Sequence, residues 1–331
     1  MARGATTEGN VKPRNLRGQV VLISGAAGGL GAALCRRYAA AGSHVAAMDL
    51  DADRLSSLVA ALTQGGNQAL ALPGNVADPE ACAAAVATTL AHFGRLDGLI
   101  NNAGISQRSL LQDTRIEVIR KVMEVNFFGA LHLTHAALPA IKAQRGFIAA
   151  ISSVAGFAPL IGRTGYAASK HALHGFFDSL RCEVEDDGVN VTLVCPSFIR
   201  TGIGGAALGG TGAAANSQRV TTGVEASPED IAERIFSAVA DGRRLLLPDR
   251  TSRLAWWLGR LAPAFYARTM KRRVGAEFDK LPRGGAHADS GCCPAPDADC
   301  RQHTERQAER RAEQGGAVPA AVHEQAKQQG R

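Results

Sequence analysis

The sequence predicts an α/β protein in which helices cover both faces of a doubly wound, seven-stranded parallel sheet. Between residues 19 and 248, short and almost continuously apolar runs of strand length alternate with longer segments of helical periodicity. Strands that are covered on both faces have such continuous apolar runs. A strand–helix–strand alternation also requires crossover connections between parallel strands.

The first strand is expected over 20–24, because Val20-Val21-Leu22-Ile23 is rich in β-branched residues and a glycine cluster follows it. A helix over 30–41 comes next and ends at Gly42, since glycine commonly follows the end of a helix. The other strands are expected at 44–49, 68–72, 96–101, 146–152, 189–195 and 244–247. The other helices are expected at 52–64, 79–93, 115–142, 166–185 and 228–240.

A single domain is expected over residues 19–249, because the alternation runs through it without an internal repeat. Residues 250–281 are predicted to form a basic, amphipathic helical extension. Residues 282–331 are predicted to be a disordered tail, since Val, Ile, Leu, Met, Phe, Trp and Tyr are all absent from 282–317 and no core can form there. Residues 1–18 are expected to be a flexible N-terminal arm.

The charge of the chain is concentrated in one segment. The 331 residues include 37 Lys and Arg against 30 Asp and Glu, a formal net charge of +7. Residues 250–273 contain seven basic side chains and no acidic one, so they account for the whole surplus. A basic segment raises the question of nucleic acid or an anionic membrane. No nucleic-acid recognition motif accompanies it, and we expect no nucleic-acid partner.

The basic segment also carries apolar residues at helical spacing. One apolar stripe is formed by Leu254, Leu258, Leu261 and Phe265, and both tryptophans of the chain lie in the same segment. Pro263 should kink or restart the helix. Two interpretations stay open for 252–273: peripheral contact with a membrane surface, or packing over the substrate site or a partner subunit.

The sequence shows neither a signal peptide at its start nor an apolar stretch of the ~18 residues that a membrane-spanning helix needs. Four of the seven cysteines lie in apolar segments, where reduced thiols are usual, and the other three lack zinc-finger spacing. Two pairs of histidines lack a third ligand of suitable spacing. We therefore expect a cytoplasmic protein, with peripheral membrane contact as an addition, and no metal site.

The first strand runs into a glycine-rich turn that opens a helix. Gly25, Gly29 and Gly31 fit a turn in which the backbone approaches a pyrophosphate at a helix N-terminus, although their spacing differs from G-x-G-x-x-G. The expected cofactor-binding residues of this turn are Ser24, Gly25, Gly29, Leu30 and Gly31.

Asp49 closes the second predicted strand, 24 residues after Gly25. A carboxylate there can accept hydrogen bonds from the adenosine ribose and would repel a 2′-phosphate. Neither Leu50 nor Ala27 offers a cation for that phosphate. NAD is therefore preferred, with NADP as the second option. The alternative is an Asp that caps the next helix, which Asp51 could do equally well.

Tyr166 and Lys170 are four residues apart in a predicted helix and therefore lie on one helix face. A phenol with a pKa near 10 exchanges protons poorly at neutral pH, but a nearby ammonium stabilises the phenolate and lowers that pKa. Ser153 ends a predicted strand 13 residues upstream, where its hydroxyl could hydrogen-bond a substrate carbonyl or alkoxide. The three residues predict proton transfer at a carbonyl or alcohol.

Together these residues resemble the motifs of the short-chain dehydrogenase/reductase family, whose sheet is of the Rossmann type. The resemblance extends over about 19–248. The motifs, in the family's order and spacing, are the S-G-x-x-x-G-x-G cluster, Asn101-Asn102-Ala103-Gly104, Val125-Asn126, Ser153, Tyr166 with Lys170, and Pro196 to Thr201. Residues 101–110 are most similar to the branch that includes membrane-associated steroid and retinoid reductases.

The resemblance implies roles for the matching residues. The family's catalytic tetrad corresponds to Asn126, Ser153, Tyr166 and Lys170. Tyr166 would pass the proton and Ser153 would orient the carbonyl. Asn126 would hold a water in a relay to Lys170, which would also bind the nicotinamide ribose, and Thr201 would contact the carboxamide. Cofactor contacts are implied for Asn75, Val76, Asn102, Ala103, Gly104, Tyr166, Lys170, Pro196, Ile199 and Thr201.

Three positions depart from the family pattern, and none removes a tetrad residue. Ser24 stands in place of the usual Thr and keeps the hydroxyl. Asn75 stands where Asp is frequent near the adenine, which is expected to alter cofactor affinity. Ser197 replaces the glycine after Pro196 and is expected to constrain that loop.

The leading hypothesis is an oxidoreductase that uses NAD or NADP to interconvert an alcohol and a ketone or aldehyde on a small, lipophilic substrate. The alternative is a non-catalytic dinucleotide-binding regulatory or scaffold protein, against which the intact tetrad argues. By analogy with the family, a homodimer or homotetramer is expected to pair through the helices near 115–142 and 166–185. Residues 202–223 fit either a lid over the substrate or a merely flexible loop.

Overall fold

β1 (Val20–Ser24) lies inside a seven-stranded sheet in which all neighbouring strands are parallel. The computed structural model describes residues 13–201, 206–215 and 225–279. The strand order is β3-β2-β1-β4-β5-β6-β7, so the direction of winding reverses between β1 and β4. The other strands are β2 (His44–Asp49), β3 (Ala69–Pro73), β4 (Gly98–Asn101), β5 (Phe147–Ile151), β6 (Asn190–Val194) and β7 (Leu245–Leu246). Ligands of open α/β sheets bind beyond the carboxyl ends of the strands at such a reversal.

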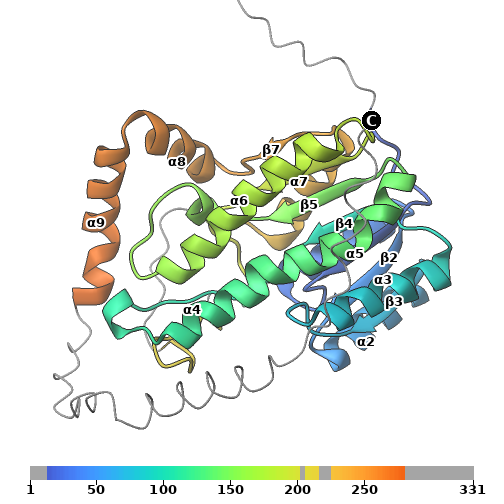
Figure 1. Ribbon diagram of the computed structural model, residues 1–331, viewed down its shortest axis with the longest axis horizontal. Helices are drawn as coiled ribbons and strands as arrows, with labels where there is room; N and C mark the ends of the chain where they lie inside the picture. The colour runs from blue at the N-terminus through green and yellow to red at the C-terminus, as the bar shows by residue number, and fades with distance from the viewer. Residues whose placement is uncertain (1–12, 202–205, 216–224, 280–331) are drawn as a thin grey trace, which may run out of the picture. The chain divides into compact units, whose positions relative to one another are not determined.

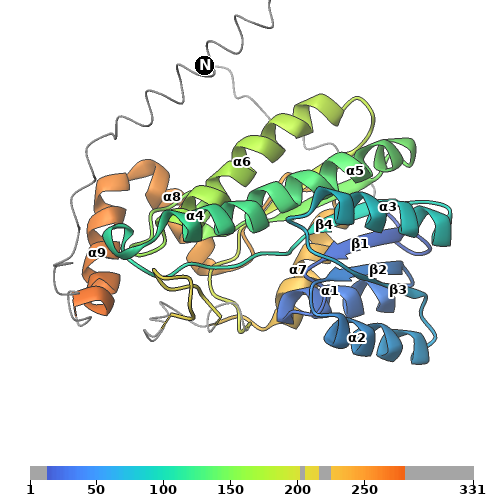
Figure 2. The same ribbon diagram turned by 60° about the horizontal axis from the view of Figure 1, so that its bottom comes forward.

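Helices cover both faces of the sheet, as Figures 1 and 2 show. One face carries α1 (Gly29–Ala40), α2 (Ala52–Gln64) and α7 (Pro228–Ala240), and the other carries α3 (Pro79–Phe93), α5 (Gly129–Ala143) and α6 (Thr164–Val184). This arrangement confirms the predicted doubly wound α/β fold. The predicted strands and helices differ from the observed ones by at most two residues at most ends.

The residues of β1 alternate between two hydrophobic cores. Val21 and Ile23 belong to the core under α1, α2 and α7, whereas Val20 and Leu22 belong to the core under α3, α5 and α6. All four side chains are fully buried. A strand that supplies both cores must be apolar at every position, which explains the continuous runs in the sequence.

The predicted helix 115–142 contains a local irregularity. It consists of α4 (Ile116–Met123) and α5, joined by η2 (Glu124–Phe128), a π-helical turn that contains Asn126. The three segments form one continuous rod in Figure 1. A π-helical turn widens the helix by one residue and is frequent at functional sites. The apolar pattern of the sequence does not reveal the extra residue of η2, because the apolar side chains of α4 and α5 on either side of it still face the core.

Residues 13–18, which we expected to belong to a flexible arm, pack on the domain instead. Leu16 is 3% exposed and joins the core of α1. The backbone N–H of Arg14 donates to the carbonyl of Ala240, 2.8 Å away. A buried leucine and hydrogen bonds to the domain together fix this segment. The rest of the predicted arm, residues 1–12, and the predicted tail, residues 282–331, lie outside the described residues.

The predicted basic extension is helical, and Pro263 divides it into α8 (Arg250–Leu261) and α9 (Pro263–Asp279). The expected apolar stripe is only partly correct. Leu258 packs inward against a small core that includes Ala255 and Tyr266. The reason is that α8 contacts the domain through the side of the helix that carries Leu258. Trp257 takes its place on the exposed side.

Candidate active site

The glycine-rich turn between β1 and α1 is shaped by close backbone contacts. Gly25 has a φ of +65°, and a Cβ atom there would lie 2.8 Å from Cα of Ala103. A Cβ atom on Gly31 would overlap the carbonyl of Gly25, and one on Gly29 would lie 3.1 Å from Cγ2 of Thr201. Gly25 and Gly31 are therefore required by close backbone contacts, and Gly29 allows the close approach of Thr201.

The N-terminus of α1 has no side-chain cap. Gly28 occupies the cap position, and no side-chain oxygen of the described residues accepts a hydrogen bond from the first turn, which begins with Gly29 and Leu30. Backbone N–H groups of a first helical turn have no partner within their own helix. Together with the glycine cradle, they form a site that suits the pyrophosphate of a dinucleotide.

Ser24 and Asn102 hold this turn in place. The Ser24 hydroxyl oxygen accepts hydrogen bonds from the backbone N–H groups of Asn102 and Ala103, each at 3.1 Å. The Asn102 amide donates to the carbonyls of Ser24 and Gly25 at 2.9 and 3.1 Å. The structure thus brings these predicted residues together, and the amide of Asn102 serves to brace the turn.

The Asp49 carboxylate lies between the glycine turn and the residue that caps the next helix. Its carboxylate accepts hydrogen bonds from the backbone N–H groups of Ala27 at 2.9 Å and Asp51 at 3.0 Å. The N-cap of α2 is Asp51, whose carboxylate accepts from the N–H of Arg54. The capping role is therefore filled by Asp51. Asp49 is half-buried at the carboxyl end of β2 and keeps acceptor capacity for a hydroxyl group.

Tyr166 and Lys170 lie one turn apart on α6, and their side chains meet. The ammonium nitrogen of Lys170 is 5.8 Å from the centroid of the Tyr166 ring and donates a hydrogen bond to the carbonyl of Ile151 at 2.8 Å. Lys170 is only 4% exposed. Burial lowers the pKa of Lys170 to about 8. A cation with two further N–H donors is thus held beside the phenol.

Asn126 lies against the same lysine but uses its side chain structurally. Its amide nitrogen donates to the carbonyl of Ile105 at 3.0 Å and to the hydroxyl of Ser169 at 2.9 Å, and its amide oxygen accepts from the N–H of Ile105 at 2.8 Å. A Cβ atom on Gly104 would lie 3.2 Å from this oxygen and 3.6 Å from the Lys170 nitrogen. Both amide protons of Asn126 are therefore occupied, so its side chain could hold a water only as an acceptor.

Ser153 follows β5 and caps the short 3-10 turn η3 (Val154–Gly156). Its hydroxyl oxygen accepts a hydrogen bond from the N–H of Ala155 at 3.2 Å. The hydroxyl proton has no acceptor among the described residues and can be donated to a ligand. Ser153 is 8% exposed, at the same sheet edge as the glycine turn and the Lys170 side chain.

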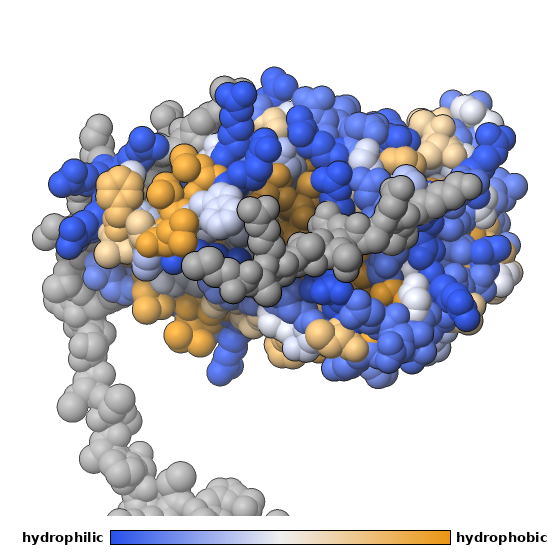
Figure 3. All heavy atoms as spheres, turned by 90° about the horizontal axis from the view of Figure 1, so that it is seen from above, coloured by the Kyte–Doolittle hydropathy of each residue, from blue (hydrophilic) through white to orange (hydrophobic). Residues whose placement is uncertain are grey.

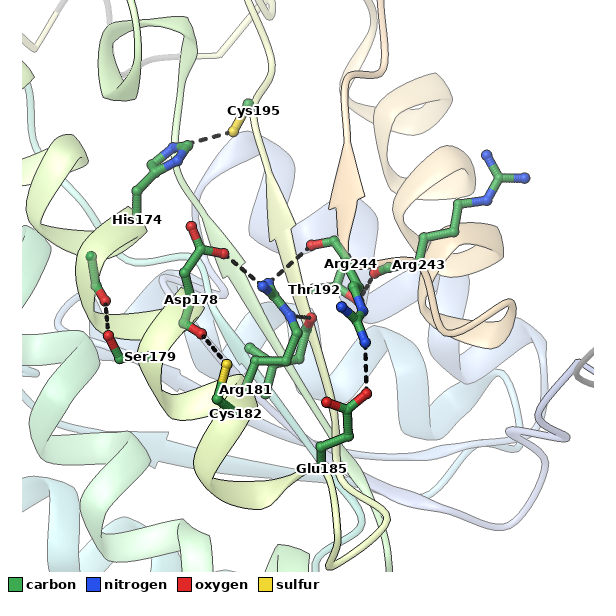
Figure 4. A network of polar contacts seen from close by, with 12 residues as sticks. His174, Asp178, Ser179, Arg181, Cys182, Glu185, Thr192, Cys195, Arg243 and Arg244 are labelled. Atoms are coloured by element: carbon green, nitrogen blue, oxygen red, sulfur yellow. Dashed lines mark hydrogen bonds and ion pairs between the residues drawn. The ribbon is translucent and has the colours of Figure 1, made fainter. Parts of the chain in front are cut away.

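A polar cluster next to Ser153, formed by Ser152, His174 and Cys195, was not predicted from the sequence. Nε2 of His174 lies 3.0 Å from the Ser152 hydroxyl, which donates to the carbonyl of Lys170 at 3.2 Å. The same nitrogen lies 3.5 Å from the sulfur of Cys195 (Figure 4). Burial lowers the pKa of His174 to about 4 and raises that of Cys195 to about 12, so both are neutral at neutral pH. The spacing of four between Lys170 and His174 was the only signal in the sequence.

The remaining predicted cofactor residues lie around the same edge. Asn75 is exposed, and its side-chain oxygen accepts from the N–H of Ala77 at 3.0 Å. Val76 is buried. The carbonyl of Pro196 accepts from the N–H of Val154 at 3.1 Å. Ile199 pairs with Ala226 in an isolated bridge, and Thr201 covers Gly29 as described above.

Ser197, the departure noted in the sequence, makes a specific contact. Its hydroxyl and its backbone N–H donate to the two carboxylate oxygens of Asp249, at 2.8 and 3.0 Å. The same carboxylate caps α8 by accepting from the N–H of Ser252 at 2.7 Å. The loop after β6 is therefore constrained, as expected, by a bond to the start of α8.

The described part of the predicted lid is fixed to the β4–α4 connection. The N–H of Arg108 donates to Leu208 at 2.7 Å, the N–H of Leu208 donates to Ser106 at 2.8 Å, and the N–H of Arg115 donates to Gly210 at 2.9 Å, in each case to the carbonyl. These bonds hold residues 206–215 at the edge of the site. The rest of the predicted lid, residues 202–205 and 216–223, lies outside the described part of the chain.

Comparisons with known proteins agree on one family. The family model described as short chain dehydrogenase matches residues 19–208. A Dehydrogenase/reductase SDR family protein 7-like from Anopheles gambiae is 39% identical over 268 residues, which is 79% of this chain and 84% of that protein. A Dehydrogenase/reductase SDR family member 7B from Rattus norvegicus is 37% identical over 270 residues, covering 79% of this chain and 83% of that protein.

Solved structures agree with the fold. A short chain dehydrogenase/reductase from Burkholderia phymatum, crystallised in complex with NAD, superposes with a TM-score of 0.65 at 23% identity and covers 81% of this chain and 98% of its own. A dehydrogenase/reductase from Sinorhizobium meliloti superposes with a TM-score of 0.62 at 28% identity, covering 70% of this chain and 94% of its own.

Proposed function

The chain belongs to the short-chain dehydrogenase family, and we propose that it is an NAD-dependent oxidoreductase that interconverts an alcohol and a ketone or aldehyde. The observation that carries this proposal is the buried ammonium of Lys170 beside the ring of Tyr166. Ser153 lies at the same edge of the sheet with a free hydroxyl proton. A proton donor, a cation that stabilises its conjugate base and a donor for the substrate oxygen are thus present together.

The glycine turn fits a nicotinamide dinucleotide. Gly25 and Gly31 leave no room for side chains, Gly29 packs closely under Thr201, and the uncapped N-terminus of α1 offers N–H donors to a pyrophosphate. Asp49 would accept hydrogen bonds from the adenosine ribose and would repel a 2′-phosphate, which favours NAD over NADP. When bound, the nicotinamide accepts or supplies the hydride.

The proton steps fall to residues of this chain. In oxidation, Tyr166 would take the proton of the substrate hydroxyl at its phenolate oxygen; in reduction, it would return a proton to the carbonyl oxygen. The ammonium of Lys170 would stabilise the phenolate form, because an opposite charge in a buried position favours the ionised state. Ser153 would donate its free hydroxyl proton to the substrate oxygen, where negative charge develops. Asn126 would fix the Ile105 segment against α6 and so keep this geometry.

A lipophilic substrate is supported by the surroundings of Ser153. The turn that follows it contains Val154, Phe157 and Ala158, which pack with Ala255 and Tyr266 into a small apolar cluster. Apolar side chains next to the polar groups of a site favour substrates with an apolar body. We further propose a homodimer or homotetramer paired through the rod of α4–α5 and α6, which light scattering of the purified protein would test.

The proposal is tested with the Tyr166→Phe variant. We expect loss of turnover over a panel of steroid, retinoid and aliphatic alcohols and carbonyls, with NADH binding retained in a fluorescence titration, because the ring stays and only the proton-carrying hydroxyl is removed. Retained turnover would exclude this mechanism. Binding of NADH by the parent without turnover of any panel member would instead indicate a non-catalytic dinucleotide-binding protein. Tighter binding of NADP than of NAD would overturn the cofactor assignment.

A further inference from the structure

An unusual share of the exposed apolar side chains lies on α8 and the start of α9. Eight large hydrophobic residues of the described chain are exposed, and four of them fall between residues 254 and 265. The exposed fractions of Leu254, Trp257, Leu261 and Phe265 are 61%, 61%, 76% and 60%. We call these four residues the apolar ridge. Isolated exposed apolar residues are common, but a contiguous group marks an interaction surface.

The apolar ridge lies among positive charges. All seven basic side chains of 250–273 are exposed, and none forms an ion pair with a residue that the structure describes. Four of them, Arg268, Lys271, Arg272 and Arg273, lie on α9 beyond the ridge. Figure 3 shows hydrophobic atoms gathered at the end of the molecule that carries α8 and α9, with hydrophilic atoms around them.

The side of α8 that lies opposite the ridge attaches the helix to the domain, and the ridge takes no part in this attachment. Ser252 and Ala255 are buried, and Trp256 packs edge-on against Phe157 with ring centroids 4.9 Å apart. The helix is capped by Asp249 in a capping box. The ridge is thus not needed to attach α8 to the domain, and its exposure has no structural purpose within the described chain.

We propose that the apolar ridge and its basic border dock on the surface of a membrane that contains anionic lipids. Tryptophan and leucine side chains on one side of a helix, with arginines and lysines beside them, are the pattern of helices that lie in a bilayer interface. The charge argues against the other occupants. A second copy would bring two faces of seven uncompensated positive charges together, and a nucleic acid would contact the charges but would gain nothing from exposed leucines.

Docking in this orientation would bring the candidate active site close to the lipid. The buried side of α8 packs on the turn that starts at Ser153, through Phe157 and Ala255. If the proposed function holds, a lipophilic substrate could then reach the site from the bilayer. Docking itself does not depend on turnover, so a binding experiment tests it separately from the proposed function.

The test is co-sedimentation of the full chain with vesicles of phosphatidylcholine alone or with added phosphatidylserine. We expect binding to the anionic vesicles that weakens as salt is raised. The Trp257→Ser/Leu261→Ser double variant should bind at least about tenfold more weakly, because it removes two side chains from the interface. Leu50→Ser is the matched control, since Leu50 is 73% exposed but lies outside the ridge, and it should bind like the parent.

Two results would overturn the proposal: absence of binding by the parent, and equal binding by the parent and the double variant. If the parent does not bind and the double variant changes from dimer to monomer in light scattering, the ridge is a contact between copies. The free energy of unfolding of both variants, measured in urea, shows whether a loss of binding comes from unfolding instead. If the double variant is unfolded, Arg272→Glu/Arg273→Glu replaces it, with the same expected loss on anionic vesicles.

Discussion

The protonation of His174 should make the stability of this protein fall steeply in mild acid. His174 is neutral in the folded chain because burial lowers its pKa to about 4. Of the charged groups near it, Asp178 favours the protonated ring, whereas His171, Arg260 and Lys170 oppose it. The folded pKa lies below the unfolded value of about 6.5, so the unfolded chain binds the proton more tightly. The contribution of neutral His174 is therefore complete above about pH 6.5 and is lost as the pH falls toward 4.

The expected size follows from the two pKa values. A folded pKa of about 4 and an unfolded pKa of about 6.5 give a loss of about 2 kcal/mol in the free energy of unfolding between pH 7.5 and pH 5. The His174→Gln variant keeps a neutral donor that can reach the Ser152 hydroxyl but cannot be protonated. Urea unfolding at both pH values should therefore show about 2 kcal/mol less acid loss for His174→Gln than for the parent.

Other titrating groups are the same in both proteins and cancel in this comparison. His135→Gln, which removes an exposed histidine of α5 away from the cluster, is the control and should follow the parent. Equal acid loss in the parent and His174→Gln would refute the reasoning, because the ring would then gain its proton as easily in the folded chain as in the unfolded one.

Three further substitutions test the cofactor side of the site. Gly31→Ala places a methyl group on the carbonyl of the preceding turn and should weaken NADH binding by at least about tenfold in a fluorescence titration, whereas Gly175→Ala on α6, whose added Cβ would meet no neighbouring atom within 4 Å, should bind like the parent; similar binding by both would contradict the packing argument. Asp49→Ala removes the charge that opposes a 2′-phosphate and should reduce the preference for NAD over NADP by about tenfold in the same titration; an unchanged ratio would show that Asp49 does not set it. Ser197→Gly loses the 2.8 Å hydrogen bond to Asp249 and should lower the free energy of unfolding in urea by about 1 to 2 kcal/mol, and a gain in stability would show that serine strains this loop.

The fold was predictable because its signals are local. The residues of β1 supply both cores, so the strand appears in the sequence as an unbroken apolar run. The glycine positions were also predictable, since a backbone that leaves no room for a Cβ atom at Gly31 admits one residue type only. Pro263 ends α8 for a comparable reason, because proline lacks the N–H that would continue the helix.

Contacts between distant segments were not predictable in the same way. The inward turn of Leu258 depends on what α8 packs against, which helical spacing alone does not specify. The occupation of both amide protons of Asn126 depends on Ile105 and Ser169, which lie 21 residues before and 43 residues after it. The family resemblance supplied the identity of Asn126 but not this hydrogen-bonding pattern. Such patterns are properties of the assembled fold.

The contacts of α8 join the proposed docking surface to both halves of the candidate site. The cap of α8, Asp249, accepts both hydrogen bonds of Ser197 in the loop that carries Thr201. Trp256, on the next turn of the helix, packs on Phe157 in the segment that follows Ser153. A displacement of α8 would therefore act on the loop that carries Thr201 and on the turn that follows Ser153 together. Three of the four ridge residues lie on the opposite side of the same helix, so a membrane that binds the ridge would also fix the positions of these two loops. Vesicles should therefore lower the KM of a lipophilic substrate more for the parent than for Ser197→Gly.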